Sequence, residues 1–175
     1  MSKPAASAPH AETTDLRAGT IQGLPFQVVR WVLYGLLRLV FGMRVEGAGN
    51  VPANGGVLLV SNHLCNADPV FVSVGCTRPA HFMAKKELFE IPVFRHVMRW
   101  FGEFPVDRGA ADRAAIRRAL ATLEQGIALG MFPEGTRSTS GALKQALPGA
   151  GLIALRGKAP IVPVAVIGTE KLPLL

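Results

Sequence analysis

A short apolar run with polar residues directly behind it constrains the fold of this chain more than any other feature. Residues 57–60 read VLLV and follow a turn-forming Asn-Gly-Gly at 54–56. A run of this length and composition behind a turn is typical of a buried strand. His63 and Asp68 come shortly after it. Open α/β sheets place their chemistry beyond the carboxyl ends of such strands, so we expect both side chains to lie there.

Similar apolar runs alternate with helical patterns along the rest of the chain. The pattern predicts further strands at 81–84, 103–106, 127–132 and 161–167, and helices at 69–75, 92–101, 112–125 and 148–156. Strands that alternate with helices indicate an α/β fold with a mainly parallel central sheet flanked by helices. A chain of 175 residues is long enough for one domain with a substantial core.

His63 and Asp68 have the chemistry of a general base and the acid that orients it. An imidazole titrates near neutral pH and can take a proton from an alcohol. A carboxylate on its second ring nitrogen would fix the tautomer and stabilise the imidazolium as it forms. The alternative is structural. Asp68 precedes Pro69, and Asp-Pro is a common helix start in which the Asp caps the helix.

A second motif, FPEGTRS at 132–138, follows the strand predicted at 127–132. Gly135 allows the backbone to approach a ligand or to adopt a positive φ. Arg137 offers a planar set of donors that suits phosphate oxygens. Glu134 can orient this arginine or bind a hydroxyl group. The alternative is a tight turn with an Arg–Glu surface pair, which contributes little energy.

Taken together, these motifs resemble those of the glycerolipid acyltransferase family, and most of all its lysophosphatidic acid acyltransferases. The resemblance rests on four blocks in the family's order: Asn62-His63-x4-Asp68, GEFPVDRG at 102–109, FPEGTRS at 132–138 and IVPV at 161–164. It covers roughly residues 45–171. The four blocks at these spacings are specific, although each alone is modest.

The resemblance implies a reaction and a role for each matching residue. His63, held by Asp68, would deprotonate the free hydroxyl of lysophosphatidic acid, which attacks the thioester of acyl-CoA or acyl carrier protein to give phosphatidic acid. The residues that match the family's phosphate site are Lys85, Arg108 and Arg137, and those that match its acceptor site are Glu134 and Gly135. The family's transfer is direct, so no enzyme nucleophile, metal or prosthetic cofactor is expected.

Three rival functions share some of these features. A sister acyltransferase that uses glycerol 3-phosphate, another lysophospholipid or an amino-acid lipid would carry every motif. A metal-dependent hydrolase could use His63 and Asp68 as ligands, but the sequence offers no third ligand at a convincing spacing. A lipid-binding protein without activity would need the basic groove but no base.

Composition favours an anionic, membrane-bound partner. The formal net charge is +7, but 49% of the residues are hydrophobic and 18% are charged. This balance and the lack of an aromatic-rich basic run argue against nucleic acid. The two cysteines, Cys65 and Cys76, have no metal-ligand spacing. So few cysteines in so long a chain suggest a reducing compartment, which fits a cytoplasmic membrane face.

Residues 26–42 predict an amphipathic helix at the membrane interface, between a flexible tail at 1–25 and the acyltransferase domain at 43–175. Gln27, Arg30, Tyr34 and Arg38 form its polar stripe, and the rest of the helix is apolar or Gly. We expect the arginines to point toward lipid headgroups. The alternative is a core helix with one polar face outward. Family members usually continue past the IVPV block, so we expect a fragment or a short form.

Overall fold

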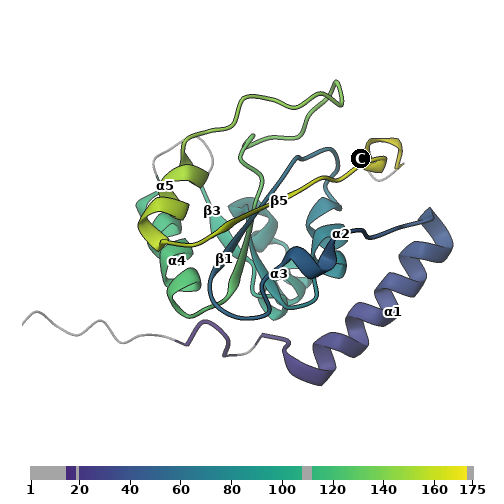
Figure 1. Cartoon of the computed structure of the whole chain (residues 1–175), viewed down its shortest axis with the longest axis horizontal. Coiled ribbons are helices and arrows are strands. Elements are labelled where there is room, and N and C mark those ends of the chain that lie inside the picture. Colours follow the sequence, from purple (N-terminus) through teal and green to yellow (C-terminus); the bar gives the residue numbers. More distant parts are fainter. Residues whose placement is uncertain (1–14, 19, 108–111, 173–175) are drawn as a thin grey trace, which may run out of the picture.

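Five parallel strands form the centre of the fold, in the order β3-β2-β4-β1-β5 (Figure 1). The computed structural model describes residues 15–18, 20–107 and 112–172. The strands are β1 Val57–Ser61, β2 Ala80–Lys85, β3 Phe104–Val106, β4 Ala128–Met131 and β5 Ile161–Val164. The predicted α/β fold with a parallel sheet is confirmed. The fifth strand is shorter than predicted, because its pairing with β1 ends at Val164.

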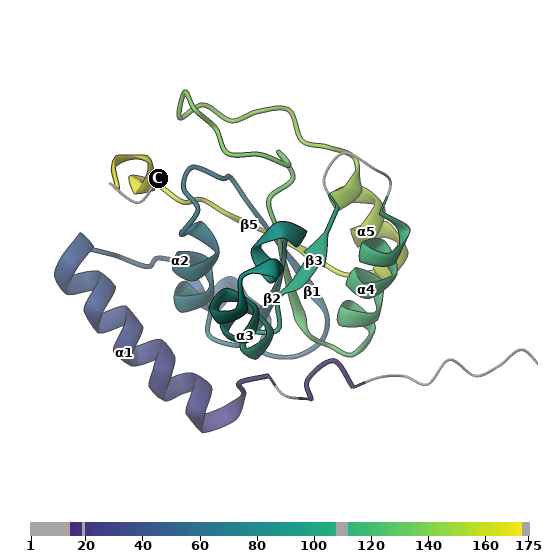
Figure 2. The ribbon, with the colours of Figure 1, turned by 180° about the vertical axis from the view of Figure 1, so that it is seen from behind.

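Helices cover both faces of this sheet. They are α1 Gly23–Phe41, α2 Asp68–Gly75, α3 Pro92–Trp100, α4 Arg113–Glu124 and α5 Gly149–Gly157, with 3₁₀ turns η1 Ala48–Asn50, η2 Lys86–Glu90 and η3 Thr169–Lys171. The connections that carry α2 and α3 run toward one edge of the sheet, and those that carry α4 and α5 run toward the other. Right-handed crossovers therefore place α2 and α3 on one face and α4 and α5 on the opposite face (Figures 1 and 2).

Each face of the sheet has its own apolar core. The core under α4 and α5 contains Leu58, Phe104, Ala119, Leu123, Leu129, Ala150, Ile153 and Ala154. The core under α2 contains Val57, Leu59, Val72, Cys76, Ala80, Phe82 and Ala128. Neighbouring residues of β1, such as Leu58 and Leu59, point into opposite cores, as the two-residue repeat of a strand requires.

The sheet order brings the two motifs of the sequence together. β1 and β4 are neighbours, but the chain leaves β1 for α2 and leaves β4 for α5, on opposite faces of the sheet. The two connections therefore leave the sheet in opposite directions at the carboxyl ends of these strands. Open α/β sheets bind their ligands at such a switch point.

Two residues of the polar stripe of α1, Gln27 and Arg30, face the domain, which corrects their predicted orientation, whereas Arg38 is exposed. The helix begins three residues before the predicted start, and Gly42 ends it in the left-handed conformation. The side-chain amide of Gln27 donates to the carbonyl of Thr77, and Nε of Arg30 donates to the carbonyl of Val74, each at 3.0 Å. Both acceptors lie in or just behind α2. The headgroup role predicted for Arg30 is therefore wrong, because its guanidinium binds the protein.

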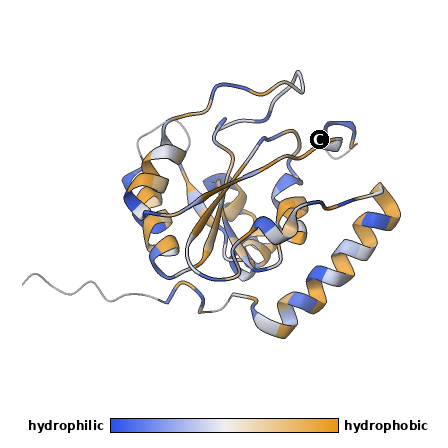
Figure 3. Cartoon of the chain, in the orientation of Figure 1, coloured by the Kyte–Doolittle hydropathy of each residue, from blue (hydrophilic) through white to orange (hydrophobic). Residues whose placement is uncertain are grey.

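The opposite side of α1 carries exposed apolar residues (Figure 3). Those more than half exposed are Leu24, Val28, Trp31, Val32, Leu36, Leu39 and Val40. By length and composition this helix could cross a membrane, and it is the one such helix among the described residues. A core helix or a signal sequence would pass the same test, but little of this helix is buried. The alternative of a core helix with its polar face outward is therefore wrong.

The segment before α1 packs against the domain where the structure describes it. Residues 1–14 and 19, which belong to the predicted flexible tail, lie outside the described residues. Leu16 and Ile21 are buried. The backbone N–H of Leu16 donates to the side chain of Gln125, and that of Ile21 donates to the carbonyl of Trp100. The part of the predicted tail that the structure describes is thus bonded to the domain.

Candidate active site

His63 and Asp68 form a hydrogen-bonded pair at the carboxyl end of β1. His63 Nδ1 lies 2.9 Å from Asp68 Oδ2. The histidine is 5% exposed and the aspartate is fully buried. Since an ionised carboxylate only accepts hydrogen bonds, Nδ1 carries the proton and Nε2 is left as the proton acceptor. The pair thus has the geometry of a general base with its orienting acid.

Asp68 is held by four donors. Its Oδ2 accepts from His63 and from the backbone N–H groups of Leu64 and Cys65 at 2.6 and 2.7 Å, and its Oδ1 accepts from the Thr169 hydroxyl at 2.7 Å. Burial raises the pKa of Asp68, but the hydrogen bonds, led by that from His63, outweigh it and place the pKa below 3.8. Asp68 makes no capping bond to α2, whose N-cap is Ala67. The helix-cap interpretation is therefore wrong.

An aromatic stack fixes the plane of the His63 ring. Phe132, directly after β4, stacks on His63 with ring centres 4.1 Å apart and on Phe82 at 5.8 Å. A Cβ atom at Gly130 would lie 2.2 Å from the Phe82 ring, so only glycine leaves room for this ring. The stack therefore connects the imidazole to the core under α2.

The FPEGTRS loop is attached to the backbone of His63. The N–H of Ser138 donates to the carbonyl of His63 at 2.7 Å. Gly135 has a φ of +69°, in the region that favours glycine. Glu134 is buried, and its Oε2 accepts from the backbone N–H of Lys144 at 3.4 Å. The loop therefore contains a turn at Gly135 and is bonded to the backbone of His63, but Glu134 is buried and does not form the surface pair of the alternative interpretation.

The basic candidates differ in how the structure places them. Arg137 is exposed on the same loop. Lys144, which the sequence did not single out, donates to the carbonyl of Arg137 at 2.6 Å and adds a second cation beside it. Lys85 lies at the end of β2, exposed, with its ammonium 3.2 Å from Glu87. Arg108 lies outside the described residues.

Two further positioning contacts escaped the sequence argument. Thr169, in η3, is buried and donates to Asp68 although 101 positions separate them. The Asn62 side chain makes a reciprocal pair with the backbone of Val166, at 2.8 and 2.7 Å. Both contacts tie the segment behind β5 to the loop behind β1. The resemblance includes Asn62 in its first block, but nothing in the sequence marks Thr169.

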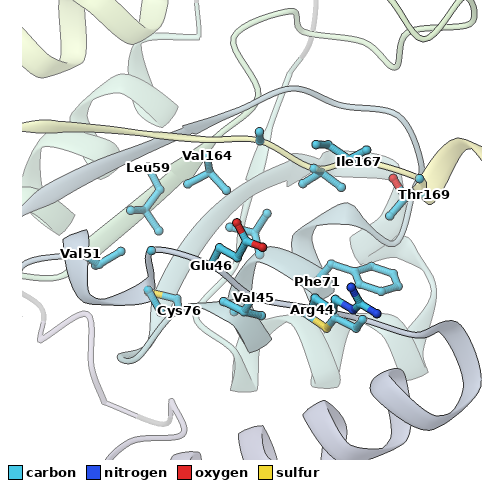
Figure 4. Close-up of a pocket in the computed structure, with 18 of the residues that line it drawn as sticks. Arg44, Val45, Glu46, Val51, Leu59, Phe71, Cys76, Val164, Ile167 and Thr169 are labelled. Atoms are coloured by element: carbon cyan, nitrogen blue, oxygen red, sulfur yellow. The ribbon is translucent and has the colours of Figure 1, made fainter.

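A cavity of about 630 Å³ lies between α2, the segment that joins α1 to β1, and the segment at and behind β5 (Figure 4). Its walls combine apolar side chains, such as Leu59, Phe71 and Val164, with the charged Arg44 and Glu46. Thr169 also lines it. The cavity therefore meets the His63–Asp68 pair through Thr169, which donates to Asp68.

The donor set does not favour the metal-dependent hydrolase. Among the residues that the structure describes, no three His, Cys, Asp or Glu side chains gather as a metal site would require. Cys65 and Cys76 are both buried and not in a disulfide. The described residues thus offer no third ligand to accompany His63 and Asp68.

Residues 42–167 match the family model described as Acyltransferase. This match covers most of the chain, and the chain belongs to the acyltransferase family.

The similar proteins include several named 1-acyl-sn-glycerol-3-phosphate acyltransferase. The relative from Bacillus subtilis is 36% identical over 135 residues, which are 76% of this chain and 66% of that protein. The relative from Salmonella typhimurium is 31% identical over 145 residues, which are 79% and 58% of the two chains.

A solved structure extends the similarity to three dimensions. The crystal structure of the 1-acyl-sn-glycerophosphate acyltransferase of Thermotoga maritima has a TM-score of 0.69 at 26% identity. The match covers 85% of this chain and 60% of that chain. The chain thus spans less than two thirds of the length of each of these three proteins.

Proposed function

We propose that this protein transfers a fatty acyl group from a thioester to the free hydroxyl of 1-acyl-glycerol 3-phosphate, giving phosphatidic acid. The observation that carries the proposal is the buried His63–Asp68 pair at the carboxyl end of β1, in which the hydrogen bond to Asp68 orients the imidazole and three further donors hold the carboxylate. Family membership and the names of the relatives support the same reaction.

The chemistry requires a base and a means of positioning. His63 Nε2 takes the proton of the acceptor hydroxyl while the oxygen attacks the thioester carbonyl. The carbon–sulfur bond then breaks, and the thiolate leaves with the proton that His63 returns. Base catalysis of this kind contributes roughly 10²–10⁴-fold, and alignment of the two substrates adds to it. No covalent intermediate on the protein is needed.

The phosphate of the acceptor is assigned to basic residues near the carboxyl ends of the strands. Arg137 is the leading candidate, because its loop is bonded to His63 through Ser138. Lys85 and Arg108 follow from the family motif, and Glu134 and Gly135 are assigned to the glycerol part of the acceptor. Lys144 joins them through its bond to the Arg137 carbonyl.

The donor and the location complete the proposal. The thioester is acyl-CoA or acyl carrier protein, with no metal or prosthetic cofactor. The protein acts at the cytoplasmic face of a membrane, where the acceptor and product reside. The exposed apolar side of α1 supports this location, because it has no protein partner among the described residues.

An assay of the purified protein with a panel of acceptors and both donors tests this function. Mass spectrometry should find phosphatidic acid only when 1-acyl-glycerol 3-phosphate and a thioester are both present. Thiol release without an acceptor, or loss of activity with a chelator, would favour a hydrolase. Preference for glycerol 3-phosphate or another lysophospholipid would assign the protein to a sister activity.

Arg137→Lys tests the phosphate assignment. Lysine keeps the charge but loses the planar set of donors, so use of 1-acyl-glycerol 3-phosphate should fall by about tenfold. Monoacylglycerol, which has no phosphate, should be affected much less. An equal loss on both acceptors would mean that Arg137 supports the loop and does not bind phosphate.

A further inference from the structure

The outer side of α3 is apolar and exposed. Val93 is 73% exposed, Phe94 52%, Val97 48% and Trp100 44%. These four residues, hereafter the α3 face, recur at the spacing of one helical turn, as on an amphipathic helix. Within Pro92–Trp100 only Met98 is buried. The helix thus exposes more apolar surface than it packs against the domain.

The polar side of α3 is entirely basic. It carries Arg95, His96 and Arg99, and the helix contains no acidic residue. Nε of Arg95 donates to the carbonyl of Phe89, but Arg99 is exposed. A short helix that combines an apolar face with cations matches the surface of an anionic bilayer, where apolar side chains enter the acyl region and cations meet phosphates.

The α3 face is continuous with the N-terminal end of α1. The N–H of Ile21, just before α1, donates to the carbonyl of Trp100 at 2.8 Å. Both helices lie on the α2 side of the sheet (Figure 2). Gly23–Phe41 likewise contains arginines and no acidic residue. Two adjacent helices therefore expose apolar and basic residues on one side of the molecule, and none of their residues is acidic.

We propose that the α3 face binds an anionic phospholipid bilayer, as a second membrane contact besides α1. This contact would hold the domain against the bilayer through two adjacent helices and so restrict its rotation about α1. The proposal concerns binding alone and stands whether or not the protein transfers acyl groups.

The two tryptophans of the chain allow each contact to be observed separately. Trp31 lies on the exposed side of α1 and Trp100 on the α3 face. In Trp31→Phe, the emission of Trp100 should shift to the blue on phosphatidylglycerol vesicles and be quenched by brominated acyl chains. Trp100→Phe reports on α1 in the same way. A shift of Trp31 without any shift of Trp100 on the bound protein would overturn the proposal.

Charge substitutions test the energy of the contact. Val93→Asp combined with Val97→Asp should weaken binding to phosphatidylglycerol vesicles by about tenfold or more. Leu155→Asp is the matched control, because Leu155 is 81% exposed on α5 across the sheet; it should bind like the unchanged protein. Arg99→Gln should weaken binding about fivefold on these vesicles and leave phosphatidylcholine vesicles unaffected.

Two other outcomes also decide the question. Unchanged vesicle binding by the double variant, with circular dichroism showing an intact fold, would overturn the proposal. A change in oligomeric state without a change in vesicle binding would assign the α3 face to a second copy of the chain. If the double variant does not fold, the Trp100 emission alone decides.

Discussion

Two buried histidines lie on opposite faces of the same sheet and differ in almost every contact. His63 is 5% exposed, stacks on Phe132 and donates a hydrogen bond from Nδ1 to the fully buried Asp68. His81 in β2 is 2% exposed and lies against the backbone of Gly102, where a Cβ atom would come within 2.2 Å of its ring. Burial, together with the charges of Arg118 and Arg17, lowers the pKa of His81 to about 4.

The difference shows what distinguishes a base from a core residue. Burial alone favours the neutral imidazole, and at His81 the charged neighbours are cations, so nothing compensates. At His63 the carboxylate of Asp68 can stabilise an imidazolium as it forms. Backbone donors and Thr169 keep that carboxylate ionised in turn. The carboxylate partner, and not burial, makes His63 the candidate for catalysis.

The largest expected effect separates the two histidines by activity. His63→Ala should lower acyl transfer by roughly 10²–10⁴-fold, because it removes the base. His81→Leu, at a buried position outside the proposed site, should leave the rate per folded molecule nearly unchanged. Initial rates of phosphatidic acid formation measure both. Comparable losses in the two variants would remove the functional distinction.

Asp68→Asn should make His63 resemble His81 by removing its charged partner. The rate should fall by roughly 10²-fold, because an amide neither fixes the tautomer nor stabilises the imidazolium as well. The carboxylate also stabilises the fold above its ordinary pKa of 3.8, and this contribution is lost as the pH falls through the lower folded-state value. Denaturation of both proteins should therefore converge at low pH. A normal rate in Asp68→Asn would mean that the pair is structural.

The sequence predicted the elements well because their causes are local. The run at 57–60 and the helical spacing at 112–125 became β1 and α4 within one or two residues. His63 and Asp68 were also predictable, since five positions separate them on one loop and helix start. The parallel order of β4 and β1 then brought FPEGTRS to His63, as the rule for strand ends requires.

What the sequence missed depends on contacts between distant segments. The polar stripe on α1 is visible in the sequence, but the carbonyls of Val74 and Thr77 that receive it belong to another element. The helical pattern therefore predicted the polar stripe, but it did not predict which side of the helix contacts the domain. Thr169 was missed for the same reason, because a single threonine forms no pattern and its partner lies 101 positions away.

The third prediction concerns the pH dependence of stability, to which His81 contributes. The unfolded chain protonates His81 near pH 6.5 and the folded chain near 4, so stability falls as the pH drops through this window. The loss should be about 2 kcal/mol between pH 7 and 5. Glu103 opposes it, because burial raises its pKa to about 7 and stability then falls as the pH rises.

The two titrations can be separated by substitution. Urea denaturation of Glu103→Gln should reveal the full loss toward pH 5, and Glu103→Gln combined with His81→Leu should abolish it. A slope that persists in the double variant would assign the titration to another group.

The smallest effect is expected from two buried threonines, Thr169 beside His63 and Thr122 on the side of the sheet where His81 lies. Thr169 donates to Asp68 and Thr122 donates to the carbonyl of Arg118 on α4, at 2.7 and 2.8 Å, and both are buried. Hydrogen bonds to charged groups are worth about 1.5–3 kcal/mol, so Thr169→Val should lower kcat by about tenfold by loosening Asp68. Thr122→Val removes a comparable hydroxyl far from the base and should leave kcat unchanged. Thr169→Ser keeps the donor and should restore most of the rate, with KM nearly constant throughout.

If Thr122→Val lowers kcat as much, or if serine fails to restore it, Thr169 contributes to packing alone and Asp68 is held by its loop.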